Sequence, residues 1–128
     1  AELLPRMHPG GPNASVSIFG DRVVAVSKDG QVFCLAADTG REIWKADLPS
    51  IMAIKVPNWG FASSPVLHDG LILTSAGKVA ALDLATGKPA WTSADAIHPG
   101  YTTTVVFKRG GDTFIAALGG KELTILSA

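Results

Sequence analysis

Short stretches of alternating apolar and polar residues, separated by turn-forming residues, run along the whole chain. In the first third these stretches cover residues 14–18, 22–27, 31–36 and 42–46. The turns between them are Gly20-Asp21, Asp29-Gly30 and Asp38-Thr39-Gly40. Asp-Gly between two alternating segments is a strong signal for a β-hairpin. The pattern therefore predicts four short antiparallel strands in succession.

One segment is ambiguous between strand and helix. Residues 78–85 are rich in Ala and Leu, which favour helix. The matching segment one repeat earlier, residues 31–37, is rich in β-forming residues, so we predict a strand in both places. No part of the chain shows sustained helical periodicity.

The chain also repeats itself. Residues 34–44 and 81–91 carry Leu, Thr, Gly and Trp at identical spacing, offset by 47 residues. A third copy begins at Tyr101 and runs to Leu126, without reaching another Thr-Gly-x-x-x-Trp. A self-match of this period indicates a repeat architecture in which each unit buries its apolar face against its neighbours. We predict an all-β fold of propeller blades, each a four-stranded antiparallel sheet.

The repeats divide the chain into four segments. Residues 1–10 precede the first unit, residues 11–60 and 61–100 each hold a blade and a link, and residues 101–128 hold a partial third blade. A propeller ring typically needs about 4 to 8 blades. The sequence therefore predicts an incomplete propeller, part of something larger.

An unpaired strand is expected at the end of the third copy. That copy lacks an outer strand, which leaves the strand over residues 123–126 as an open edge, and open edges invite pairing. Glu2-Leu3-Leu4 alternates and is not used by any complete blade. We predict that it serves as an outer strand, either for a preceding blade or for another copy of this chain. Expected partners are thus the remaining blades or other copies.

Composition supports a compact β protein and narrows the partners. Apolar residues make up 47%, charged residues 17%, and 14 Gly and 8 Pro punctuate the strands. The formal net charge is zero and no basic run exceeds Lys108-Arg109, so nothing favours a nucleic-acid partner. No stretch approaches the roughly 18 apolar residues of a membrane span, and the chain does not start with a signal-peptide pattern.

Candidate chemistry is sparse. A single cysteine excludes an internal disulfide, and Cys34 lies in mid-strand among apolar neighbours, where we predict a buried structural thiol. The three histidines, at 8, 68 and 98, are isolated, so no metal site is predicted. Ser63 and Ser64 lack the G-x-S-x-G frame of a nucleophile. We predict no catalytic residue in this chain.

Residues 35–44 and 82–91 resemble the A-x-D-x-x-T-G-x-x-x-W docking motif of pyrroloquinoline-quinone (PQQ)-like β-propeller repeats. The resemblance implies that the motif Trp packs against the neighbouring blade, that a Thr-Gly turn caps it, and that the protein is periplasmic or otherwise extracytoplasmic. Structural roles are thereby implied for Thr39, Gly40, Trp44, Thr86, Gly87 and Trp91. We expect the two indoles to occupy equivalent places, where truncation to Ala costs about 3 to 5 kcal/mol.

The resemblance does not bring an enzyme with it. Quinoprotein dehydrogenases similar to this repeat add an adjacent-cysteine disulfide, acidic and amide ligands for calcium, and a catalytic aspartate. The single cysteine cannot supply the disulfide, and none of the other positions can be matched. PQQ and calcium are therefore implied by the family resemblance alone. The repeat also occurs in a non-catalytic periplasmic lipoprotein that helps to assemble outer-membrane barrels.

The links that precede each innermost strand are the candidate binding region, because loops on a rigid scaffold commonly carry function. The candidate residues are Lys55, Asn58 and Trp59 in the first link, and His98 and Tyr101 in the second. We hypothesise that they line the central mouth of the ring. The alternative is that Trp59 and Tyr101 wedge between blades.

Two functional classes remain open. The first is a propeller segment that acts as a binding or scaffolding module for a protein or small-molecule partner. The second is part of a PQQ-dependent dehydrogenase whose cofactor and metal ligands lie outside this segment. The single cysteine and the unmatched catalytic positions favour the first.

Overall fold

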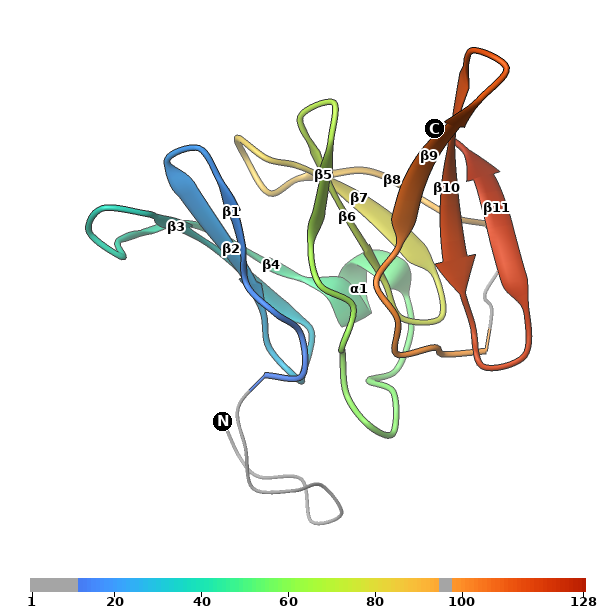
Figure 1. Ribbon diagram of the computed structural model, residues 1–128. Coiled ribbons are helices and arrows are strands. Elements are labelled where there is room, and N and C mark those ends of the chain that lie inside the picture. The colour runs from blue at the N-terminus through green and yellow to red at the C-terminus, as the bar shows by residue number, and fades with distance from the viewer. Residues whose placement is uncertain (1–11, 95–97) are drawn as a thin grey trace.

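Three antiparallel β-sheets lie side by side in chain order (Figure 1). The computed structural model describes residues 12–94 and 98–128. Strands that are consecutive in sequence pair within each sheet, so every sheet is a simple meander. The predicted all-β fold of small blade-like sheets is confirmed.

The first sheet has four strands: β1 (Ser17–Phe19), β2 (Arg22–Val26), β3 (Gln31–Ala36) and β4 (Glu42–Asp47). The sequence placed the start of β1 at Ala14, three residues too early. Ser15, before this strand, and the side chain of Ser17, at its start, bond to the segment that leads into β5. The backbone N–H of Ser15 donates to Ser64 Oγ at 3.0 Å, and Ser17 Oγ donates to the carbonyl of Pro65 at 2.7 Å.

The second sheet repeats the first: β5 (Val66–His68), β6 (Leu71–Ser75), β7 (Val79–Asp83) and β8 (Pro89–Thr92). The ambiguous Ala- and Leu-rich segment forms β7, as predicted. Trp44 pairs with Cys34, Trp91 pairs with Ala81, and a register shift follows each pair. The same irregularity at the same place marks the two sheets as copies of one unit.

The third sheet has three strands: β9 (Val105–Arg109), β10 (Asp112–Leu118) and β11 (Leu123–Ser127). The order β11-β10-β9 leaves β11 as an edge within the described chain, as predicted. The proposed outer strand at Glu2-Leu3-Leu4 lies outside the described residues.

A short helix that the sequence analysis did not predict, α1 (Leu48–Met52), follows β4. Five residues are too few to show helical periodicity, and the helix is set by its ends instead. Asp47 caps the N-terminus by accepting from the N–H of Ser50, and Ala53 ends the helix in the left-handed region. No helix within residues 12–94 and 98–128 is long and apolar enough to cross a membrane.

The buried core lies between the sheets in two clusters. The first cluster joins the first and second sheets, and its fully buried members include Val24, Val32 and Cys34 on one side and Ile72 and Leu82 on the other. The second joins the second and third sheets through Leu73, Val79, Ala81, Ile115 and Ala117. Burial raises the pKa of the Cys34 thiol, so this cysteine is protonated and packs as a small apolar side chain.

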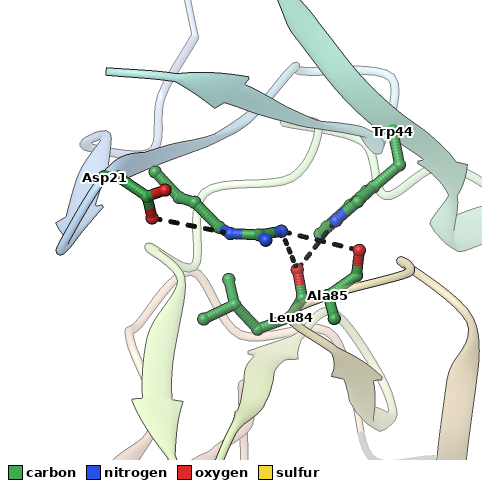
Figure 2. Close-up of polar contacts among 5 residues, drawn as sticks. Asp21, Trp44, Leu84 and Ala85 are labelled. Carbon is green, nitrogen blue, oxygen red and sulfur yellow. Dashed lines mark hydrogen bonds and ion pairs between the residues drawn. The ribbon is translucent and has the colours of Figure 1, made fainter. Parts of the chain in front are cut away.

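The first two sheets are tied together at one backbone oxygen. The indole Nε1 of Trp44 donates to the carbonyl of Leu84 at 2.8 Å, and Nη1 of Arg22 donates to the same carbonyl at 3.1 Å (Figure 2). Asp21 Oδ1 lies 3.8 Å from Nε of Arg22. Two side chains of the first sheet therefore converge on the turn between β7 and β8.

Trp91 occupies the same register position in its sheet as Trp44, but it is less buried. Trp44 is buried, whereas Trp91 is half-buried at the edge of the second cluster. Within residues 12–94 and 98–128, no hydrogen-bond partner of the Trp91 indole is found. Among the described residues, the expected equivalence therefore holds for the position in the sheet but not for the surroundings, because the turn between β7 and β8 covers Trp44 and no described turn covers Trp91.

Gly87 and Gly40 offer a matched test of this contact. Both have positive φ, at 71° and 69°, so alanine adds a similar backbone strain of about 1–2 kcal/mol at either place. A Cβ at residue 87 would lie 2.5 Å from Cε3 of Trp44, whereas one at residue 40 would meet nothing within 4 Å. We expect Gly87→Ala to lower the free energy of unfolding in urea by about 1–3 kcal/mol more than Gly40→Ala does. Equal losses would contradict the close packing of the turn on Trp44.

Candidate binding site

The links and the central turns of the sheets meet at one end of the molecule. In a four-stranded meander, the link into the first strand, the turn between the second and third strands and the link out of the fourth lie at the same end. The two links therefore lie at the same end as the β6–β7 and β10–β11 turns. Function carried by the links has to involve these turns as well.

A pocket of about 570 Å³ opens at this end, within the range of small-ligand sites. Its lining residues are Ile54, Lys55, Val56, Pro57, Asn58, Ala76, Gly77, His98, Pro99, Tyr101, Gly120 and Lys121. Two stretches of the lining come from the links and two from the turns. The pocket is thus shared by the second and third sheets and the link that follows α1.

Four of the five candidate residues line this pocket: Lys55, Asn58, His98 and Tyr101. Trp59 lies beside the pocket, not in its lining. Its N–H donates to Tyr101 Oη at 3.4 Å, and its carbonyl accepts from Asn13 Nδ2 at 2.8 Å. Within the described chain, Trp59 is 57% exposed and Tyr101 is 41% exposed. That these residues line the mouth of a complete ring stays a prediction.

Buried anchors hold the first link at both ends. Leu48 and Met52 of α1 are fully buried at its start, and Phe61 is fully buried at its end. The N–H of Phe61 also donates to the carbonyl of Lys28 at 2.9 Å. The segment 54–58 is therefore presented from a fixed base, which lowers the conformational entropy that a ligand would have to remove.

A carboxylate holds the second link onto the third sheet. Glu122 Oε1 accepts from the backbone N–H of His98 at 2.6 Å and lies 3.3 Å from Nδ1 of the same residue. The N–H of Gly120 donates to the His98 carbonyl at 3.0 Å. The backbone N–H of His98, and then its ring, hold the pKa of the Glu122 carboxyl below its usual range.

The described lining carries positive charge. Its charged side chains are those of Lys55 and Lys121, and it includes no carboxylate. Such a site favours anionic or polar groups, and its described lining offers calcium no carboxylate ligand. Within the described residues no group of three or more His, Cys, Asp or Glu side chains is placed to hold a metal ion. The lining thus fits an anion better than a metal, and it does not match the calcium site that the resemblance implies.

The turns that complete the pocket were not predicted from the sequence. Ala76, Gly77, Gly120 and Lys121 were not among the candidate residues, although all four line it. The meander predicted from the sequence already places these turns at the same end as the links. Counting strands from each link indicates the right end of each sheet, and only the packing of neighbouring sheets brings these turns to the pocket.

Comparisons with known proteins identify relatives. A family model described as "Outer membrane protein assembly factor BamB" matches residues 4–128. A polyvinylalcohol dehydrogenase from a Pseudomonas species is 28% identical over 102 residues, which cover 76% of this chain and 15% of that protein. The chain therefore spans about 15% of the length of this curated relative.

Solved structures share the fold. BamB from Moraxella catarrhalis superposes with a TM-score of 0.58 at 22% identity, over 80% of this chain and 35% of that one. Quinohemoprotein alcohol dehydrogenase from Comamonas testosteroni superposes with a TM-score of 0.59 at 26% identity, over 86% of this chain and 17% of that one. The chain again spans a minor part of each neighbour.

The pKa shift of Glu122 predicts a pH-dependent contribution to stability. Because the pKa is lowered in the folded state, the contribution is present above the ordinary value of 4.5 and is lost as the pH falls through the folded-state pKa. We expect Glu122→Gln to lower the urea midpoint at about pH 7. The difference in midpoint between this variant and the unsubstituted chain should shrink towards about pH 3. Glu42→Gln, at an exposed position on β4, is the control and should show a smaller effect at about pH 7. A pH-independent effect of Glu122→Gln would contradict the assignment.

Proposed function

Because the chain belongs to the PQQ-like repeat family whose model is described as outer membrane protein assembly factor BamB, we propose that it acts as a binding or scaffolding module. The partner is a protein or a small molecule, and it binds at the end of the propeller that carries the links. By the same family relation, the compartment is extracytoplasmic.

The observation that carries this proposal is the pocket itself. Four candidate residues from the links line one pocket together with the β6–β7 and β10–β11 turns. Lys55 and Lys121 attract anionic groups, while the exposed rings of Trp59 and Tyr101 offer flat amphipathic surfaces of the kind that dominates recognition sites. The site therefore suits an anionic group on a partner that also has an aromatic or apolar part.

The motif tryptophans supply the scaffold in this proposal. Trp44 docks on the Thr86-Gly87 turn of the next sheet, and we extend this role to Trp91 and the third blade. We also propose that the remaining blades of the propeller are partners of the segment. Successive docking of this kind holds the links in fixed relative positions.

A second candidate function rests on the sequence relatives. Similarity to a polyvinylalcohol dehydrogenase and to a quinohemoprotein alcohol dehydrogenase favours a place within a PQQ-dependent dehydrogenase. In that case the quinone and metal ligands lie outside this chain, since the described pocket lining holds no carboxylate and the chain has one cysteine.

An anionic probe tests the binding face. In an NMR titration with citrate, we expect the largest amide shifts at Gly77, His98 and Gly120, which line the pocket. Lys55→Ala with Lys121→Ala should weaken citrate binding by about tenfold, because both cations of the lining are lost. Lys88→Ala, in the exposed turn before β8, is the control and should leave the affinity unchanged. Shifts spread evenly over all surface lysines would overturn the pocket as the site.

A quinone titration separates the two functions. The longest native polypeptide that carries this chain is titrated with PQQ, with and without Ca²⁺, while the quinone absorbance is followed. A binding or scaffolding module should show no saturable uptake, because it has no cofactor site. Saturable, calcium-dependent uptake would favour the dehydrogenase instead.

A further inference from the structure

Three buried hydroxyl groups have no hydrogen-bond partner within the described part of the chain. They belong to Ser63, Thr74 and Thr104, which are 1%, 1% and 2% exposed. A buried hydroxyl without a partner destabilises the folded state, so groups of this kind are normally satisfied by protein atoms or by an ordered water. The surroundings of the first two hydroxyls indicate what satisfies them.

Thr74 faces the first sheet from the middle of the second. Ile72, two residues before it, and Ala76, two residues after it, both belong to the first core cluster. Side chains two residues apart in an extended strand share a side of the sheet. Ala80, which pairs with Thr74 across β7, belongs to the same cluster. Two neighbours of Thr74 on this side are therefore alanines, which fill little of the space beside its hydroxyl.

Ser63 faces the same interface from the link that leads into β5. Phe61, two residues before it, is a fully buried member of the first cluster. Leu67, four residues after it, pairs with Ile72 of that cluster. Alternation counted from either side therefore places Ser63 on the side of the second sheet that faces the first.

The register of β5 and β6 brings the two hydroxyls near each other. Val66 pairs with Leu73, and continuing this register by three places sets Ser63 opposite Ala76 and diagonal to Thr74. Diagonal neighbours on one face have Cα atoms roughly 7–8 Å apart and side chains that lie closer. The two hydroxyls do not bond to each other. One water at about 2.8 Å from each of them spans a gap of about 5–6 Å.

We propose that one buried water binds between the first and second sheets and bridges Ser63 Oγ and Thr74 Oγ1. Each hydroxyl can donate or accept, so both can bond to the same water in either orientation. A buried water with polar partners on two segments is part of the fold. This water joins the link to β6, and the proposal depends neither on the pocket nor on the proposed function.

The third hydroxyl supplies a matched control. Thr104 is equivalent to Ser63, because each lies five residues before the residue that closes its hairpin. The residue of the third sheet that is equivalent to Thr74 is Ile115, which is fully buried and has no hydroxyl. Thr104 therefore lies in a separate interface and lacks the second hydroxyl of the proposed bridge.

A double-mutant cycle tests the bridge. We expect Thr74→Val and Ser63→Ala each to raise the unfolding equilibrium constant in urea by about three- to tenfold, because each leaves the water with a missing partner. The double variant should raise it by about as much as the larger single change, because both changes remove the same bridge. Combining Thr74→Val with Thr104→Val should instead multiply the two single effects, because these residues lie in different interfaces.

Two results of this cycle would overturn the proposal. Removing a hydroxyl that has no partner at all should stabilise the chain, so Thr74→Val would then lower the unfolding constant. Effects of Ser63→Ala and Thr74→Val that multiply would show that the two hydroxyls do not share a water.

A high-resolution crystal structure provides a test that does not depend on stability. The longest native polypeptide that carries this chain should show one water oxygen within hydrogen-bonding distance of both hydroxyls. The same polypeptide with Thr74→Val should lack this water. A dry interface, or a direct bond between the two hydroxyls, would overturn the proposal.

Discussion

The carbonyl oxygen of Leu84 is the point through which the first sheet is fixed to the second. The indole of Trp44 and the guanidinium of Arg22, both from the first sheet, donate to it, and the turn that carries it lies against the Trp44 ring (Figure 2). At the opposite end, the backbone bond from Phe61 to Lys28 joins the same two units, and the bond from Leu48 to Gly30 holds the start of the link between them. Because these two sheets are held at both ends, the link between them is fixed in place, and so is the wall of the pocket that this link forms.

The strands were predictable because their signals are local. Alternation fixes which side chains share a face, and Asp-Gly or Asp-Thr-Gly fixes where a strand ends. The repeat settled β7, whose own composition favours helix. Two features escaped because their causes are not periodic: α1 depends on the Asp47 cap and a nearby proline, and the start of β1 depends on bonds to a link almost 50 residues later. Long-range bonds of that kind leave no trace in a window of sequence.

The candidate site was predicted in part, for related reasons. Four lining residues could be predicted because they are polar or aromatic and lie in the links, without any knowledge of how the sheets pack. The turns that complete the pocket required the strand count and the packing of neighbouring sheets together. The contact between His98 and Glu122 joins residues 24 positions apart, and only the fold brings them together. Trp59 shows the opposite limit, because an exposed ring beside a pocket gives the same sequence signal as one inside it.

The packing of Trp44 on Gly87 of the following unit joins two unlike ends. The first unit supplies a tryptophan to its successor, and the second supplies a turn whose glycine lies against that indole. An in-frame duplication of one whole unit therefore reproduces a matching junction on both sides of the new copy. Arrays built on this rule can lengthen or shorten during evolution without forming a new kind of contact. A deletion that removes only half a unit, by contrast, leaves a tryptophan indole without the glycine on which it packs.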